Sequence, residues 1–248
     1  MQVAAAALAR ATESQIVELR QYSLRPGGRD ILIDTFERRF IEPQEAAGAR
    51  LIGQFRDVDD PDRFVWLRGF PDMRTRRRML ETFYSSPLWL THREAVNELL
   101  VDSDNVLLLR VLRPGSGFTA LGPPPAGGEV SPRVITATIC LFEQEPGQDV
   151  LDLFESVLRP ALTDAGAPPI AAFVTETSPN DVPRLPVREG EHAIVWFARF
   201  PDNAAHDAYV EELARRRAWS QSLARPGCRL VAAPQMLRLA PTPRSALR

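Results

Sequence analysis

Polar and aromatic side chains recur at alternating positions in three short runs of the chain, and together they could do chemistry. Alternate residues of a strand share one face, so each run offers one polar face. The residues on these faces are Glu18, Arg20 and Tyr22 in residues 16–24, Gln54 and Arg56 in residues 49–56, and Trp66 and Arg68 in residues 64–70. In one interpretation, the arginines hold a carboxylate, enolate or phosphate of a ligand. In the other, Glu18 pairs with the arginines and only fixes how the chain packs.

A histidine on a predicted helix is the second chemical signal. The run SSPLWLTHREAVNELL spaces Trp89, His92, Val96 and Leu99 along one helical face, so His92 has apolar neighbours. It is either a hydrogen-bonded core residue, or a general acid/base or axial haem ligand in a pocket between helix and sheet. We take His92 and Arg68 as candidate catalytic residues. The candidate ligand-binding residues are Arg20, Tyr22, Gln54, Arg56, Trp66, Tyr84 and Trp89.

The two signals are expected on opposite sides of the sheet. Helices should cover the apolar face, which carries Val17, Leu19, Val65 and Leu67. Arg20 and Arg68 then point away from the helices, so His92 cannot share a pocket with them. The sequence therefore predicts two rival sites, one on each face.

Other motifs favour structural roles. RTRRR (74–78) predicts a solvated helix face. The run DVDDPDR (57–63) lacks the full spacing of a calcium loop and predicts a solvated turn. Neither HExxH nor a paired-cysteine spacing occurs in the sequence, so we expect no metal site.

The composition is that of an ordinary globular protein and excludes several functions. The 248 residues are 44% hydrophobic and 25% charged with a net charge of −2, so we expect neither nucleic acid nor membrane as a partner. All 30 basic residues are arginine, which excludes a lysine Schiff base and a phosphate-loop lysine. This bias is typical of a GC-rich genome and favours a bacterial source. Cys140 and Cys228 predict two free thiols in a reducing, cytoplasmic compartment.

The order of predicted elements, β-α-β-β-α-β, occurs twice, which indicates a tandem duplication. Phe36 corresponds to Phe154 at an offset of 118 (154 − 36), and Trp66 to Trp196 at an offset of 130 (196 − 66). The second copy therefore has 12 extra residues (130 − 118), which fall within 178–190. We expect a flexible leader (1–15), a first repeat (16–113), a Pro/Gly-rich linker (114–133), a degenerate second repeat (134–241) and a tail (242–248).

The first repeat resembles a known family. The runs ELRQYSLRPG, FERRFIEP, FVWLRGFPDM and FYSSPLWLTHREAVNELL are similar to those of NIPSNAP domains, within the dimeric α+β barrel superfamily. The resemblance implies two ferredoxin-like βαββαβ units packed sheet to sheet as an internal pseudo-dimeric barrel. Relatives of this barrel include cofactor-free monooxygenases, polyketide cyclases, isomerases and haem enzymes.

These signals together predict a small-molecule-binding protein. We expect a partly apolar metabolite with an acidic or enolic oxygen as its ligand, and a cofactor-independent cyclase, isomerase or monooxygenase reaction as one activity. The alternatives are a non-catalytic scaffold or interaction module, and a haem-binding protein. A homodimer of the chain is also an expected assembly. A cavity of a few hundred Å³ in the first repeat, without a counterpart in the second, would favour the ligand-binding interpretation.

Overall fold

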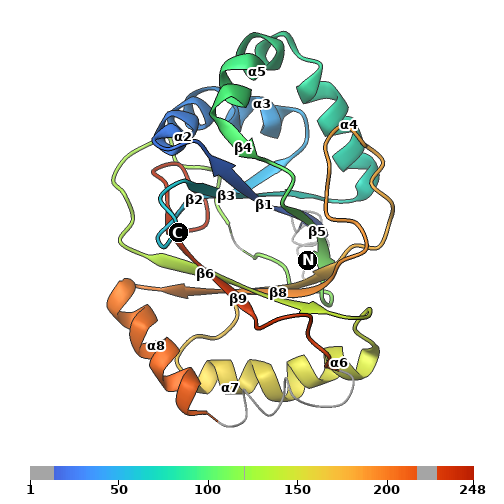
Figure 1. The fold of residues 1–248 in the computed structure, drawn as a ribbon, viewed down its shortest axis with the longest axis vertical. Coiled ribbons are helices and arrows are strands. Elements are labelled where there is room, and N and C mark those ends of the chain that lie inside the picture. The colour runs from blue at the N-terminus through green and yellow to red at the C-terminus, as the bar shows by residue number, and fades with distance from the viewer. Residues whose placement is uncertain (1–13, 120, 217–227) are drawn as a thin grey trace, which may run out of the picture.

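The computed structural model describes residues 14–119, 121–216 and 228–248 (Figure 1). The predicted leader, residues 1–15, lies outside the described residues except for its last two. Trp219 and Ser222, which the offset of 130 aligns with Trp89 and His92, also lie outside them.

The first half of the chain (16–113) contains five strands and four helices. The strands are β1 (Ile16–Leu24), β2 (Arg50–Asp57), β3 (Arg63–Phe70), β4 (Leu100–Asp102) and β5 (Val106–Val111). The helices are α2 (Gly28–Arg39), α3 (Ile41–Ala46), α4 (Met73–Tyr84) and α5 (Pro87–Leu99). Side chains cap two of these helices at the N-terminus: the Asp72 carboxylate accepts a hydrogen bond from the Thr75 N–H, and the Ser86 hydroxyl accepts one from the Trp89 N–H.

The second half (134–241) has the same order of strands. Its strands are β6 (Val134–Phe142), β7 (Ala171–Thr175), β8 (His192–Phe200) and β9 (Gln235–Pro241). Its described helices are α6 (Gln148–Leu153), a π-helical stretch (Phe154–Leu158), α7 (Arg159–Asp164) and α8 (Asn203–Arg215).

Eight antiparallel strands close into one barrel, in the order β3-β2-β9-β6-β8-β7-β5-β1, with β1 returning to β3. Each half contributes four adjacent strands, and the short β4 extends the end of β1. The helices of the first half lie on one side of the barrel and those of the second half on the other (Figure 1). The structure is therefore an α+β barrel made of two ferredoxin-like units, as the sequence predicts.

Strand registers agree with both offsets found in the sequence. Glu18 pairs with Arg68 in the first half, and Thr136 pairs with Ala198 in the second. The pair Gln54 and Trp66 likewise corresponds to Ala172 and Trp196. Side chains at matching positions of the two halves can therefore be compared directly.

The prediction of which sheet face meets the helices is wrong. Val17, Leu19, Val65 and Leu67 point into the barrel, where they pack with apolar side chains of the second half such as Ile135 and Val195. The opposite face, with Trp66 and its polar neighbours, meets the helices. Both faces of a barrel strand are buried here, and the more apolar one fills the interior. Alternation alone does not distinguish the interior face from the helix face.

Two segments outside the predicted repeats contribute to the barrel core. Phe118, in the segment predicted as a linker, is 7% exposed and contacts Phe173 and Phe197. Leu247, in the predicted tail, is 2% exposed, and its N–H bonds to the carbonyl of Ile52. None of the described helices is both long and apolar enough to span a membrane.

Candidate functional site

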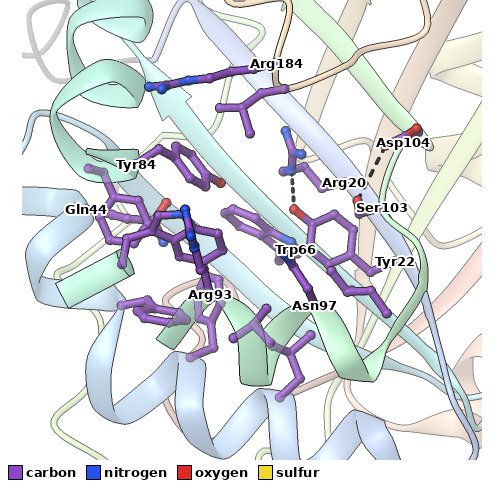
Figure 2. Close-up of a pocket in the computed structure, with 18 of the residues that line it drawn as sticks. Arg20, Tyr22, Gln44, Trp66, Tyr84, Arg93, Asn97, Ser103, Asp104 and Arg184 are labelled. Atoms are coloured by element: carbon purple, nitrogen blue, oxygen red, sulfur yellow. Dashed lines mark hydrogen bonds between the residues drawn. The ribbon is translucent and has the colours of Figure 1, made fainter. Parts of the chain in front are cut away.

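A cavity of about 370 Å³ lies between the outer face of the first-half sheet and its helices (Figure 2). Its walls are largely aromatic and include Tyr22, Phe36, Phe40, Trp66, Tyr84 and Trp89. Its polar lining residues include Arg20, Gln44, Arg93, Asn97, Asp104 and Arg184. This size and this mixture of aromatic walls with a few polar groups are typical of a site for a small organic ligand.

A buried carboxylate beneath the cavity binds three arginines. One oxygen of Glu18 accepts hydrogen bonds from Arg20 (2.8 Å) and from Arg68 Nε (2.7 Å). The other oxygen accepts one from Arg76 Nε at 2.7 Å. All four side chains are at most 2% exposed. Glu18 is therefore the shared anionic partner of three guanidinium groups taken out of water.

Positive charge is in excess in this cluster. Three guanidinium groups meet one fully buried carboxylate, and the next acid, Asp181, bonds to Arg76 at 3.1 Å and is 30% exposed. The cluster of Arg20, Arg68, Arg76, Glu18 and Asp181 thus has a formal charge of +1 (3 − 2). An uncompensated buried charge is costly, so the cluster favours an anionic group in the adjoining cavity.

Ionisation of the cluster follows from this arrangement. Burial by itself raises the pKa of Glu18, but Arg68, Arg20 and Arg76 outweigh burial and hold that pKa well below its ordinary value. Burial raises the pKa of Tyr22, and the positive charge of Arg20 opposes this only in part. Glu18 is therefore a carboxylate and Tyr22 a neutral phenol at neutral pH.

Arg20 and Tyr22 together form a donor site on the cavity surface. Arg20 Nε donates to the Tyr22 hydroxyl oxygen at 2.9 Å, which leaves the phenol proton free to bind another acceptor. Trp66 also lines the cavity, and its buried indole N–H has no hydrogen-bond partner among the described residues. A negatively charged ligand oxygen in the cavity would accept hydrogen bonds from Arg20 and the Tyr22 hydroxyl.

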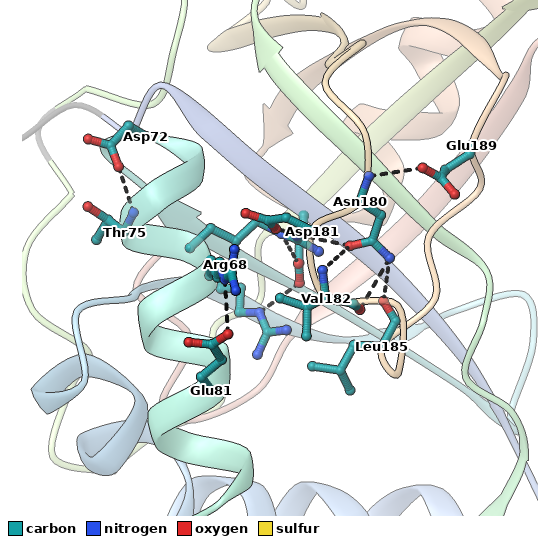
Figure 3. Close-up of polar contacts among 12 residues, drawn as sticks. Arg68, Asp72, Thr75, Glu81, Asn180, Asp181, Val182, Leu185 and Glu189 are labelled. Atoms are coloured by element: carbon teal, nitrogen blue, oxygen red, sulfur yellow. Dashed lines mark hydrogen bonds and ion pairs between the residues drawn. The ribbon is translucent and has the colours of Figure 1, made fainter.

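The predicted insertion, residues 178–190, crosses from the second half and covers part of this cavity; we call it the strap (Figures 2 and 3). Val182 is 4% exposed and belongs to the apolar core of the first half. Asn180 and Asp181 each accept a hydrogen bond from Arg76, at 3.2 and 3.1 Å. Arg76 therefore connects the strap to Glu18, and through Glu18 to Arg20.

Among the described residues, the second half has neither these charges nor a comparable cavity at the matching place. At the positions of Glu18, Arg20, Arg68 and Arg76 it has Thr136, Thr138, Ala198 and His206. The described residues at the matching place, among them Cys140, Phe154 and Trp196, enclose about 10 Å³. Within the described part of the chain, the cavity is therefore specific to the first half.

The structure brings together five of the predicted ligand-binding residues. Arg20, Tyr22, Trp66, Tyr84 and Trp89 all line the cavity. The predicted division into two rival sites is wrong, because the arginines and the helices share one side of the sheet.

Four other predicted residues lie outside the cavity lining. Arg68 lies behind it, bonded to Glu18, Gln44 and Tyr84. Gln54 is fully buried, and Arg56 pairs with Asp30 at the surface. His92 is half-buried with its ring against Phe40. Because His92 is not among the described lining residues, that lining offers no imidazole that could bind haem iron. The catalytic roles of His92 and Arg68 stay predictions.

Sequence reasoning missed Arg76, although a signal for it existed. The prediction of a solvated face is confirmed for Arg74, Arg77 and Arg78, which are exposed, but it is wrong for Arg76. Arg76 lies three, four and seven residues before the buried Met79, Leu80 and Phe83, so it belongs to the apolar stripe of α4. Gln44, Arg93 and the strap residues carried no comparable signal.

The closed ring of eight strands with helices outside defines a dimeric α+β barrel, formed here by one chain. The sequence model of the NIPSNAP family matches residues 17–112, and an uncharacterized NIPSNAP-like domain protein from Burkholderia xenovorans is 34% identical to this chain. That match covers 38% of this chain and 81% of the other, with a TM-score of 0.35. The chain belongs to the NIPSNAP family through its first half.

Two solved structures share the whole fold at low identity. An anthrone oxidase-like protein is 13% identical with a TM-score of 0.60, and the match covers 94% of this chain and 93% of the other. A putative monooxygenase from Lactobacillus acidophilus NCFM is 10% identical with a TM-score of 0.55, covering 92% and 94%. No curated protein matches the chain.

Proposed function

We propose that the first-half cavity binds a partly apolar, aromatic metabolite through an acidic or enolic oxygen, and that the chain acts on it without an organic cofactor. The observation that carries this proposal is the charge imbalance: three buried guanidinium groups face one fully buried carboxylate beneath an aromatic cavity. A ring stacks on the aromatic walls, and its oxygen binds Arg20 and the Tyr22 hydroxyl.

The reaction that this geometry favours begins with loss of a proton from carbon or oxygen. The negative charge that develops on the ligand oxygen is stabilised by Arg20 and Tyr22, which are already oriented before the reaction. Among the described lining residues Asp104 is the sole carboxylate, and it is our candidate proton acceptor. Cyclisation, isomerisation and cofactor-free oxygenation all begin with such a step.

Binding can be tested with 2-naphthol and naphthalene, titrated into the full chain by calorimetry. 2-Naphthol should bind more tightly than naphthalene. Arg20→Met should weaken the affinity for 2-naphthol by about 10-fold or more, because a hydrogen bond to a charged group contributes roughly 1.5–3 kcal/mol to binding. Arg78→Met removes an exposed charge from α4 and serves as the control. Equal affinity for both compounds, or no effect of Arg20→Met, would refute the proposal.

Catalysis can be tested with anthrone, an enolisable aromatic ketone chosen because of the structural neighbour named above. Oxygenation consumes one O₂ per anthrone and yields anthraquinone and water, so an oxygen electrode and quinone absorbance should agree. We expect wild type to oxidise anthrone faster than the Arg20→Met and Asp104→Asn variants do. If the protein binds 2-naphthol but does not turn over anthrone, the proposal of a binding site is kept. Oxygenation of enolisable aromatic ketones is then refuted.

A further inference from the structure

The cavity has a second set of cations besides Arg20. Arg93 of α5 and Arg184 of the strap also line it, and Asp104 is the sole acid among the described lining residues. Arg184 has no hydrogen bond or ion pair among the described residues, and the nearest acid to Arg93 is the neighbouring Glu94 at 3.9 Å. Both side chains are exposed, so they lie at the cavity mouth, whereas Arg20 is buried at its floor.

Local structure holds Arg184 in this place. Val182, Pro183, Arg184 and Leu185 form a turn closed by a 2.9 Å hydrogen bond from the Leu185 N–H to the Val182 carbonyl. Proline at the second position is favoured in such turns. The Asn180 side-chain amide donates to the carbonyls of Val182 and Leu185, at 3.3 and 3.0 Å. These hydrogen bonds hold the turn, whose end residues Val182 and Leu185 lie close to Asn180 (Figure 3), and Arg184 is its third residue.

Apolar contacts anchor the same turn to the first half. Val182 is buried, and Leu185 and Val187 pack against the aromatic core around Trp66. A loop fixed in this way loses little conformational entropy when its charged side chain binds a ligand. Arg184 is thus presented to the cavity by residues that belong to the other half of the chain.

We propose that the ligand carries two acidic groups, an enol or phenol that binds Arg20 at the floor and a carboxylate that binds Arg184 and Arg93 at the mouth. The inference rests on the proposed function, since it assumes that the cavity is the ligand site. It adds a substrate class: rigid aromatic acids with a hydroxyl group at the opposite end. It also gives the strap a role, which is to select for the carboxylate.

The test compares three probes in the full chain by calorimetry: 6-hydroxy-2-naphthoate, its neutral methyl ester, and 2-naphthol. Wild type should bind the carboxylate about fivefold more tightly than the ester, because an exposed ion pair changes a binding constant by roughly 1.5- to 5-fold and two arginines act here. The preference should fall as ionic strength rises from about 0.05 to 0.5 M.

Arg184→Ala should reduce the preference for the carboxylate to about twofold and leave the affinity for 2-naphthol within about twofold of wild type. Arg78→Ala removes an exposed arginine of α4 outside the cavity lining and should change neither value. Because Arg184 is exposed and has no partner among the described residues, the variant should fold, which circular dichroism would verify.

The outcomes separate the two proposals. If wild type binds the acid and the ester equally well, the proposed carboxylate site at Arg184 and Arg93 is refuted. Binding of 2-naphthol would still support the hydroxyl site at Arg20. Equal weakening of all three probes by Arg184→Ala shows that the strap acts only structurally, and this too overturns the inference. If 2-naphthol binds no better than naphthalene, the proposed function fails and the inference fails with it.

Discussion

Replacement of Glu18 by glutamine should strongly destabilise the protein. The substitution keeps the size of the side chain but removes the one fully buried carboxylate that Arg20, Arg68 and Arg76 share. A glutamine amide has one acceptor oxygen and one donor nitrogen. If its oxygen keeps Arg20 and Arg68, its NH₂ group faces the Nε–H of Arg76, and two donors then meet.

The expected cost follows from burial. Breaking a buried ion pair by removing one partner costs about 3–5 kcal/mol, because the remaining charge is left without compensation. Glu18 is 0% exposed, and Arg68 and Arg76 are equally buried, so we expect a loss of about 4 kcal/mol in the free energy of unfolding. For a chain of this length that corresponds to a fall in Tm of about 8–16 °C.

The pH dependence of this loss has a definite sign. The folded pKa of Glu18 lies below its unfolded value, so the stabilisation is complete above the unfolded pKa of about 4.3 and decreases as pH falls toward the folded pKa. The difference between wild type and Glu18→Gln should therefore be constant from about pH 6 to 8. It should shrink below about pH 4.

Urea unfolding followed by tryptophan fluorescence measures the effect, and two comparisons sharpen it. Glu94→Gln changes a side chain that is 85% exposed and should stay within about 0.5 kcal/mol of wild type. Glu18→Gln combined with Arg68→Met should be less destabilised than Glu18→Gln alone, because it leaves fewer unpaired charges. A Glu18→Gln protein as stable as wild type at pH 7 would refute the account of the charge cluster.

Two further predictions concern packing and thiol chemistry. Phe118→Ala should lower the free energy of unfolding by about 3–5 kcal/mol, and Phe118→Leu by clearly less, because the ring fills the barrel interior beside Phe173 and Phe197; a loss below about 1 kcal/mol in urea unfolding would contradict this role. Burial, with a smaller effect of Cys228, raises the pKa of Cys140 to about 12, so this thiol should react with iodoacetamide at pH 8 only after unfolding in urea. Mass spectrometry of peptides measures this modification. Modified Cys140 in the folded protein would contradict the prediction.

Strand order and local signals were predictable because they depend on neighbouring residues. Asp72 and Ser86 begin helices in the structure as their side-chain chemistry predicts. The offsets of 118 and 130 match the observed registers because strands and their partners keep a strict period of two. These inferences needed no knowledge of which element covers which face.

The site was only partly predictable, because it depends on long-range contacts. Arg20, Tyr22 and Trp66 were identified from alternation, but the side of the sheet was not, since both faces are buried. Arg76 resembled its exposed neighbours in type and differed only in helical phase. The strap was recognised as an insertion, yet nothing in its composition showed that it would cover a cavity of the other half.

The single-chain barrel has a consequence for how its binding properties can change. When two identical subunits form such a barrel, each substitution appears at two symmetry-related places. A covalently joined barrel is free of that restriction: one half can keep a charged floor while the other converts the matching place to an apolar interior and lends a loop to its neighbour. Asymmetry of this kind lets one lobe specialise in recognition and the other in support.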